Sequence, residues 1–445
     1  MIRPATIYLC FFCTCFVLTA ARAADSDQQW GQWRGPDATG VARHADPPVK
    51  WDEKTNVKWK IAIPGVGHAS PIVWKDRVFV LTAIETDKEA AKSGPPQAPG
   101  PSWGPPSKGT NKVHKFEVLA LNRHDGSVVW QRTASEGVPH AGTHGAGSWA
   151  SGSPVTDGES LYAFFGSKGL YCFDMNGKPL WHKDLGDMQV RMNFGEGSSP
   201  ALYGDTLVLN WDHEGESFIV AFDKRTGNAL WKIPRDERTS WSTPVVIEVD
   251  KKPQIIVSAT NRIRAYDLKA GDVIWECGGM TGNVIPCPVF DGDLLYMMSG
   301  FRGSALVCVR PSKAKGDITD TEAVVWRLGK NTPYVPSPLL YDDLLYFLRS
   351  NNEVLSCFNA KTGGEQYSGQ KLEGLKGVYS SPVGAAGRVY ISGLNGVTVV
   401  VKHGSEYKVL DANTLDDSFS ASAALAGKEL FLRGEKHLYC IADEK

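Results

Sequence analysis

A two-residue motif recurs along this chain and constrains its fold more than any other feature. A small residue followed by proline opens an apolar stretch, and successive copies begin 83, 46, 44, 44, 50, 44 and 41 residues apart. Short strands that repeat every roughly 40–50 residues predict a β-propeller or a solenoid, because one repeat cannot bury both faces of its own sheet and must stack on its neighbours. The copies stand at Ser70-Pro71, Ser153-Pro154, Ser199-Pro200, Thr243-Pro244, Cys287-Pro288, Ser337-Pro338, Ser381-Pro382 and, in degenerate form, Ser422-Ala423.

Each copy contains four predicted strands, and the turn between the third and the fourth has the most regular sequence. In the first copy this turn has the pattern Ala120-x-Asn122-x-x-Asp125-Gly126-x-x-x-Trp130, and the spacing returns in later copies. Asp or Asn caps such a hairpin through its own backbone, Gly adopts the positive φ of a bulged turn, and Trp offers a large apolar surface. We therefore expect the aromatic residues at this position to dock between blades: Trp59, Trp130, Trp181, Trp231, Trp275, Trp326 and Tyr367.

The two ends of the repeat region complement each other. Residues 438–441 form a third strand with no fourth strand after it, whereas residues 57–61 form a fourth strand with no blade before it. We predict an all-β fold, an eight-bladed β-propeller of four-stranded blades over residues 57–445, in which the N-terminal strand completes the last blade. Such pairing removes the open strand edges that an incomplete blade would expose.

The long first interval is explained by an insertion at residues 85–115, between the second and third strands of the first blade. Its middle, residues 93–106, is rich in Pro and Gly, which predicts an extended loop in place of helix or sheet. In a propeller, the loops that lead into the first strands and those between the second and third strands share one face. We therefore expect the insertion, with Trp103, to rise over that face.

The first residues of the chain are typical of a secretory signal. Residues 1–24 contain Arg3, an apolar run over residues 7–21 and a small-residue exit at Ala21-Arg22-Ala23. This pattern predicts an exported protein, periplasmic or extracellular, with no membrane span in the mature chain and an N-terminal extension at residues 25–56; an uncleaved anchor is the alternative. Cleavage removes two positive charges from a formal net charge of −1, giving −3, and this near balance argues against a nucleic-acid partner.

Six cysteines follow the predicted signal. Four of them occupy one repeat position at which other copies have Ala, which predicts small, buried packing sites: Cys172, Cys308, Cys357 and Cys440. Cys277 and Cys287 stand ten residues apart around a Gly-rich segment. A disulfide between these two is conceivable in an oxidising compartment and is left open.

The turn motif resembles the tryptophan docking motif of quinoprotein-type propellers. Over about residues 28–443 the chain resembles the pyrroloquinoline-quinone-like (PQQ-like) repeat family, and residues 30–36 and 396–413 resemble an exported eight-bladed branch of it. The resemblance implies one of two functional classes. Dehydrogenases of the family bind the quinone and calcium at the centre of the ring with carboxylate and Asn ligands, a basic residue, a stacking Trp and, in many members, a disulfide between adjacent cysteines. Scaffolds such as the outer-membrane barrel-assembly lipoprotein have the blades and no cofactor.

Few residues match the quinone site that the first class would need. Calcium takes six to eight oxygen ligands, and the candidates near the first strands are Asn193, Glu196 and Asp212, with Arg238 as the basic residue. No two cysteines are adjacent in the chain. We therefore expect no catalytic residue, no metal and no cofactor, with a PQQ- and calcium-dependent alcohol or sugar dehydrogenase as the alternative.

The leading hypothesis is a non-catalytic propeller that binds a protein, peptide or cell-envelope ligand on the face of the first-strand loops. Aromatic and Arg residues are the side chains that contact patches favour. The candidate residues on this face are His68, His144, Glu196, Asp212, Arg238, Trp241, Arg302, Tyr334 and Tyr379.

Two polar segments admit more than one interpretation. His140 and His144 could share a metal ion, but their Gly-rich setting favours a structural loop. The segment Asp212-His213-Glu214 is expected to be solvated or to form a polar rim with Arg302 and Arg349.

Overall fold

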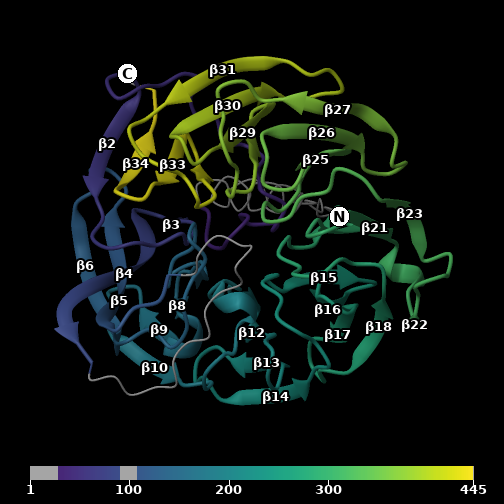
Figure 1. Ribbon diagram of the computed structural model, residues 1–445, viewed down its shortest axis with the longest axis horizontal. Helices are drawn as coiled ribbons and strands as arrows, with labels where there is room; N and C mark the ends of the chain where they lie inside the picture. The colour runs from purple at the N-terminus through teal and green to yellow at the C-terminus, as the bar shows by residue number, and fades with distance from the viewer. Residues whose placement is uncertain (1–28, 91–107, 444–445) are drawn as a thin grey trace, which may run out of the picture.

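The computed structural model describes residues 29–90 and 108–443 and contains eight small sheets arranged around one axis, as predicted (Figure 1). The predicted signal at residues 1–24, the middle of the insertion and Trp103 lie outside the described residues. Within the described ranges, helical structure is limited to three short 3₁₀ turns: η1 (Gly166–Lys168), η2 (Arg191–Asn193) and η3 (Pro311–Lys313). No helix within residues 29–90 and 108–443 has the length and apolar character needed to cross a membrane.

The first four blades follow one another along the chain, each as an antiparallel meander with its first strand nearest the axis (Figure 1). They contain β3 (Ile72–Trp74), β4 (Arg77–Glu89), β5 (Lys112–Asn122) and β6 (Val128–Gly137); β7 (Val155–Thr156), β8 (Ser160–Phe164), β9 (Leu170–Asp174) and β10 (Pro179–Lys183); β11 (Ala201–Tyr203), β12 (Thr206–Trp211), β13 (Phe218–Asp223) and β14 (Ala229–Pro234); and β15 (Val245–Val249), β16 (Lys252–Val257), β17 (Ile263–Asp267) and β18 (Val273–Cys277).

The last four blades continue the ring, and two short strands add to it: β1 (Val41–Ala42) pairs with β28, and β22 (Gly316–Asp317) pairs with β18. The blades contain β19 (Val289–Phe290), β20 (Leu295–Ser299), β21 (Ala305–Val309) and β23 (Val324–Leu328); β24 (Leu339–Tyr341), β25 (Leu344–Leu348), β26 (Val354–Asn359) and β27 (Glu365–Lys371); β28 (Val383–Ala385), β29 (Arg388–Ser392), β30 (Val397–Lys402) and β31 (Val409–Thr414); and β32 (Ala424–Ala426), β33 (Glu429–Arg433), β34 (His437–Ile441) and β2 (Val57–Ala62).

The predicted closure of the ring is confirmed. Strand β2 pairs antiparallel with β34, with Trp59 opposite Cys440, so the N-terminal strand is the outer strand of the eighth blade. The insertion begins and ends as strand, because β4 continues to Glu89 and β5 starts at Lys112, and these two residues are paired. The predicted loop at residues 85–115 is therefore shorter than expected by the length of these two strand extensions.

Five of the docking tryptophans have one geometry. Each indole N–H donates to a backbone carbonyl of the next blade, and each ring lies against the turn glycine of that blade. At Gly126, where φ is 76°, an added Cβ would lie 2.8 Å from the Trp59 ring, so only glycine fits both the backbone and the contact. The donor–acceptor pairs are Trp59–Arg123 (2.9 Å), Trp130–Met175 (3.1 Å), Trp181–Lys224 (3.1 Å), Trp231–Leu268 (3.0 Å) and Trp326–Ala360 (3.0 Å).

Two docking positions differ because the next blade differs. Trp275 is fully buried and donates to Gln254 Oε1 of its own blade (3.2 Å), since η3 and β22 replace the turn that would receive it. The Tyr367 ring packs edge-on against Tyr407 at a centroid distance of 5.6 Å. The N-terminal extension fills the following junction, where buried Trp51 stacks on Tyr390.

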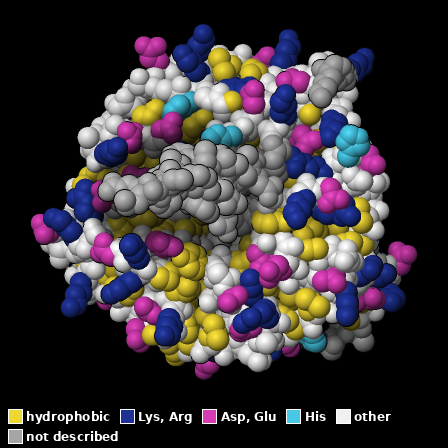
Figure 2. Space-filling view, turned by 180° about the vertical axis from the view of Figure 1, so that it is seen from behind, with side chains coloured by type: hydrophobic (Ala, Val, Ile, Leu, Met, Phe, Trp, Pro, Cys, Tyr) yellow, Lys and Arg dark blue, Asp and Glu magenta, His cyan; other side chains and the backbone are white. Residues whose placement is uncertain are grey.

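Charged side chains of both signs lie on the outside of the ring. Figure 2, which views the molecule from the side opposite to Figure 1, shows acidic and basic groups interspersed around the described rim. This distribution agrees with the near-neutral composition and gives the described part of this face no large surface of one charge.

Candidate functional site

The recurring small residue before proline forms a ring of hydrogen bonds around the axis. In seven consecutive steps, the backbone N–H of this residue donates to the side chain of its counterpart in the next blade. The proline that follows has no N–H of its own and therefore does not compete for the side-chain acceptor. The links run from Ser70 to Ser153 (2.9 Å), Ser153 to Ser199 (2.8 Å), Ser199 to Thr243 (3.0 Å), Thr243 to Cys287 (3.0 Å), Cys287 to Ser337 (3.0 Å), Ser337 to Ser381 (2.9 Å) and Ser381 to Ser422 (2.8 Å).

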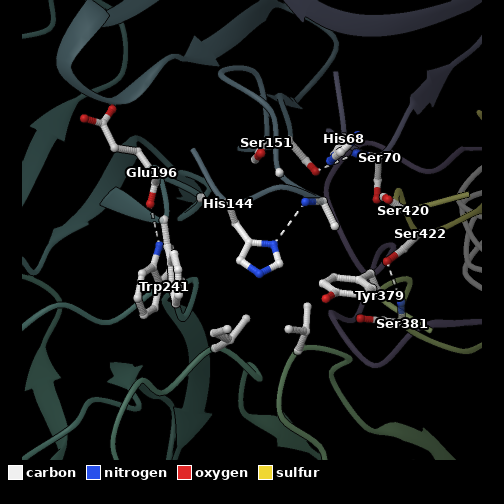
Figure 3. Close-up of a pocket in the computed structure, with 18 of the residues that line it drawn as sticks. His68, Ser70, His144, Ser151, Glu196, Trp241, Tyr379, Ser381, Ser420 and Ser422 are labelled. Atoms are coloured by element: carbon white, nitrogen blue, oxygen red, sulfur yellow. Dashed lines mark hydrogen bonds between the residues drawn. The ribbon is translucent and has the colours of Figure 1, made fainter. Parts of the chain in front are cut away.

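A pocket of about 200 Å³ lies above this ring, on the face of the first-strand loops (Figure 3). Trp33 of the N-terminal extension lines both this pocket and a second hollow on the other side of the ring, so it separates the two. Trp33 therefore forms part of the pocket floor. Its walls include His68, His144, Glu196, Trp241, Tyr334, Tyr379 and the ring serines Ser70, Ser153, Ser199, Ser381 and Ser422.

Arg34, the residue after Trp33, is buried within the second hollow. Its guanidinium donates to the carbonyls of Pro382 (2.6 Å), Pro338 (2.7 Å) and Thr39 (3.1 Å), which anchors the extension to two blades more than 300 residues away in sequence. It forms no ion pair with any described residue, and its Nε is buried without a partner. Burial lowers the pKa of Arg34 to about 10, so the group stays charged at neutral pH.

His144 projects into the centre of the pocket (Figure 3). Its Nδ1 accepts the N–H of Ala146 (3.1 Å), so the neutral ring carries its proton on Nε2. The ring packs edge-on against Phe194 (4.9 Å between centroids) and near Tyr379 (6.3 Å). Burial, followed by the positive charge of Lys108, lowers the pKa of His144, so the site presents an uncharged N–H donor.

His68 lies beside the ring at the entry to the first blade. Its backbone N–H donates to Ser148 Oγ (3.0 Å), while its side-chain Nε2 is buried without a partner among the described residues. Burial lowers the pKa of His68 to about 4, and the positive charges of Arg433 and Lys108 act in the same direction. The imidazole is therefore neutral at pH 7 and has an unused nitrogen.

The carboxyl group of Glu196 points away from the cavity (Figure 3). It accepts hydrogen bonds from the backbone N–H (2.6 Å) and the hydroxyl (2.5 Å) of Ser167. Burial raises the pKa of Glu196 to about 7. The neighbouring Trp241 indole donates to Gly195 O (2.6 Å), which holds its ring in the pocket wall.

The structure brings six of the nine predicted face residues together at this pocket: His68, His144, Glu196, Trp241, Tyr334 and Tyr379. Arg238 and Arg302 are exposed and do not line it. Trp33 and Arg34 are not among the predicted site residues, because no local sequence pattern places them near an axis formed by distant blades.

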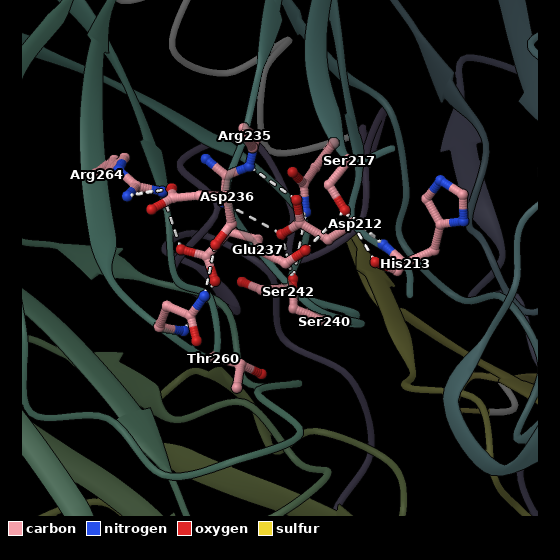
Figure 4. A network of polar contacts seen from close by, with 12 residues as sticks. Asp212, His213, Ser217, Arg235, Asp236, Glu237, Ser240, Ser242, Thr260 and Arg264 are labelled. Carbon is pink, nitrogen blue, oxygen red and sulfur yellow. Dashed lines mark hydrogen bonds and ion pairs between the residues drawn. The ribbon is translucent and has the colours of Figure 1, made fainter. Parts of the chain in front are cut away.

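The expectation that Asp212 is solvated is wrong. Asp212 forms a two-point ion pair with Arg235 (2.7 and 3.1 Å), and both side chains have no exposed surface (Figure 4). Asp212 also accepts from Ser240 Oγ (2.6 Å) and Asn210 Nδ2 (3.0 Å). Arg235 could have been found from strand register, because it follows β14 and its N–H donates to Ser217 O, beside the end of β12.

The histidine segment does not assemble a metal site. His140 pairs with Asp187 (3.3 Å) while His144 faces the pocket. Within the described ranges, no group of three or more His, Cys, Asp or Glu side chains is placed to hold a metal. Cys277 and Cys287 are both free thiols, and the Cys287 sulfur accepts the Thr243 N–H in the ring.

The pocket does not fit the calcium and quinone pair of the family's dehydrogenases. Calcium requires several carboxylate oxygens, yet of the candidate ligands Asp212 is paired with Arg235 and Glu196 with Ser167. No Lys or Arg belongs to the described pocket wall, so no basic residue stands ready for the quinone oxygens.

A protein-family model described as outer membrane protein assembly factor BamB matches residues 114–363, more than half of the chain. The chain belongs to this family of PQQ-like repeat propellers. The sequence-based assignment to the PQQ-like repeats is thereby confirmed.

Solved structures share the fold at low sequence identity. BamB from Moraxella catarrhalis is 15% identical with a TM-score of 0.52, over 82% of this chain and 98% of that one. The quinohemoprotein alcohol dehydrogenase ADHIIG from Pseudomonas putida HK5 is 10% identical with a TM-score of 0.57, over 95% and 81%. The computationally designed Ika8 protein is 10% identical with a TM-score of 0.56, over 87% and 99%. These likenesses establish the propeller fold alone.

A curated relative, tetrathionate hydrolase of Acidithiobacillus ferrooxidans, is 24% identical over 303 residues. The match covers 62% of this chain and 53% of the relative. The chain thus spans about half the length of this relative.

Proposed function

We propose that this protein is an exported, non-catalytic propeller that binds a protein, peptide or cell-envelope ligand on the face of the first-strand loops. The observation that carries the proposal is the central pocket, in which aromatic and hydroxyl side chains lie together with the chain's own Trp33. Membership of a family described as an outer membrane assembly factor and the signal-like residues 1–24 support the export and the partner class.

The polar groups of the pocket favour binding over catalysis. Among the described residues neither His68 nor His144 contacts a carboxylate, and the Nδ1 of His144 accepts a backbone N–H. A general base needs a substrate proton within reach and usually a group that orients it. The ring serines take part in blade-to-blade hydrogen bonds, which gives them a structural role.

Aromatic side chains supply anchors at the mouth of the pocket. Trp241, Tyr334 and Tyr379 come from three different blade junctions, and Phe301 packs on Tyr334 at 4.9 Å between centroids. The exposed Arg302 guanidinium lies 5.3 Å from the Phe301 ring centre. Large aromatic groups with an adjacent Arg are the residues that dominate binding energy in interfaces.

The test is affinity capture from a cell-envelope extract with three purified proteins: the wild type, Trp241→Ala and Tyr203→Ala. Tyr203 lies in β11 and lines the hollow on the opposite face, so it is the matched aromatic control. We expect Trp241→Ala to lose the captured component and Tyr203→Ala to retain it. Equal recovery with all three proteins would contradict the assignment of this face.

The alternative, a quinone-dependent alcohol or sugar dehydrogenase, has its own assay. Purified protein supplied with PQQ and calcium is mixed with a redox dye and a panel of alcohols and aldoses, and the same preparation is incubated with tetrathionate. We expect neither dye reduction nor loss of tetrathionate. Sustained turnover of any of these substrates would replace the binding proposal with an enzymatic one.

A further inference from the structure

We propose that the central pocket binds a carboxylate that carries an apolar group, as in the C-terminal residue of a peptide. This inference rests on the proposed function and names the ligand chemistry of the same pocket. The carboxylate would meet the ring hydroxyls and His144, while the apolar group would lie against Ile285, Val335 and Trp241.

Four ring serines and His144 present hydrogen-bond donors to the pocket. Ser153, Ser199, Ser381 and Ser422 each accept a backbone N–H from the preceding blade, which leaves each O–H to donate. His144 adds the Nε2–H that its bonded Nδ1 requires. A carboxylate presents only acceptor lone pairs and therefore complements such a set.

The amide and carboxyl groups of the wall already have hydrogen-bond partners within the protein. Asn351 Oδ1 accepts the Val335 N–H (3.0 Å), and the Asn351 side chain also hydrogen-bonds to the Tyr379 hydroxyl. The Glu196 carboxyl is occupied by Ser167. Buried polar groups need partners, and the unpartnered Nε2 of His68 beside Ser70 is a polar atom still without one.

Three cations lie near the pocket without belonging to its described wall: Arg34, Arg433 and Lys108. Arg34 lies behind Trp33 and has no carboxylate partner among the described residues, and a buried unpaired charge is unfavourable. Arg433 and Lys108 act on His68, and Lys108 acts on His144; no carboxylate is among the causes of either pKa shift. These three cations would attract a negatively charged ligand, whereas they would not attract a neutral sugar.

The opposite wall explains why an apolar group should accompany the carboxylate. Ile285 and Val335 precede two first strands and face the cavity with the Trp241 ring. Apolar surface of this kind gains free energy only when another apolar group covers it. Inorganic sulfate or phosphate has no such group and would leave the wall hydrated.

The direct test compares N-acetyl-leucine with N-acetyl-leucinamide, which differ only in the carboxylate, by isothermal titration calorimetry on the purified protein. We expect the amide to bind at least about tenfold more weakly, because it loses charge-assisted hydrogen bonds. Equal affinity for the two compounds would overturn the inference. Sulfate binding as tightly as N-acetyl-leucine would also overturn it, because the apolar wall would then contribute nothing.

Matched variants locate the binding groups. Cys287 shows that a thiol can accept the ring N–H, and S–H is a weak donor. Ser199→Cys and Ser337→Cys therefore both keep the ring bond, but only Ser199 lines the pocket. We expect about a fivefold loss of N-acetyl-leucine affinity for Ser199→Cys and none for Ser337→Cys. Equal losses in the two variants, or none in either, would contradict the assignment, and His144→Phe supplies an independent check at the second donor.

Failure of this inference can be separated from failure of the proposed function. Absence of N-acetyl-leucine binding together with Trp241-dependent envelope capture would overturn the carboxylate assignment alone. Carboxylate-selective binding together with capture that ignores Trp241 would support the pocket chemistry and contradict the larger binding face.

Discussion

Two buried arginines show how differently this propeller uses the same side chain. Arg235 follows the last strand of the third blade and pairs with a carboxylate at two points, whereas Arg34 lies in the second hollow and donates only to backbone carbonyls. Burial opposes the charge of Arg235, yet Asp212 outweighs it and raises the pKa; burial lowers the pKa of Arg34 to about 10. The first charge is neutralised by a carboxylate within the blade, and the second is held by backbone carbonyls alone.

The largest expected effect is at the neutralised pair. Asp212→Ala leaves the Arg235 charge buried with no carboxylate, and breaking such a pair costs about 3–5 kcal/mol. Urea denaturation monitored by circular dichroism measures the loss in the free energy of unfolding. The double variant Asp212→Leu with Arg235→Met removes both charges and should recover most of it. A loss below about 1 kcal/mol for Asp212→Ala would show that Arg235 finds another partner.

The next effect tests the burial of the uncharged His68 imidazole. Because its pKa is lowered to about 4 in the folded protein, the unfolded chain binds more protons between pH 6.5 and 4, and stability falls as pH is lowered through that range. The full shift corresponds to about 3 kcal/mol. We expect the midpoint of thermal unfolding of His68→Phe to fall less steeply between pH 6.5 and 4 than that of the wild type.

His124→Gln is the control for that measurement, since His124 is an exposed histidine in the turn of the first blade. This variant should show the same dependence of the unfolding midpoint on pH as the wild type. If His68→Phe and His124→Gln give the same pH profile, the buried His68 is not responsible for the acid sensitivity.

The third variant distinguishes two roles of Arg34: stabilising the fold, or favouring an anionic ligand in the pocket through its charge. Arg34→Met removes three hydrogen bonds to carbonyls but also an unpaired buried charge, so the net loss of stability should stay within about 1–2 kcal/mol, smaller than for Asp212→Ala. N-acetyl-leucine affinity should fall severalfold in the same variant. A stability loss as large as that of Asp212→Ala, with unchanged affinity, would show that Arg34, like Arg235, stabilises the fold and does not contribute to ligand binding.

The sequence predicts the ring well because its determinants are periodic. The small residue before proline marks seven of the eight blade entries, and the Gly-to-Trp spacing marks five docking contacts that the structure places between neighbouring blades. Trp275 departs from this geometry because η3 and β22 replace the next turn. The repeat pattern alone does not indicate this exception.

The determinants of the pocket are not periodic, and this is why sequence reasoning found only part of it. His68, Trp241, Tyr334 and Tyr379 could be found because each precedes or neighbours a first strand. Trp33 and Arg34 could not, since their contacts lie on blades formed hundreds of residues later. Asp212 was misplaced because its partner becomes a neighbour only through the pairing of three strands in one blade.

The smallest effect completes the comparison with an arginine on the surface. Arg310 pairs with Asp293 at 3.2 Å, but their side chains are 33% and 62% exposed, so water already solvates both charges. Asp293→Ala should leave the unfolding midpoint unchanged within error, and raising the salt concentration should have no further effect on the difference. If Asp293→Ala were as damaging as Asp212→Ala, pairing geometry alone would govern the cost. The expected contrast instead assigns the cost to burial, the property that Arg34 and Arg235 share and that Arg310 lacks.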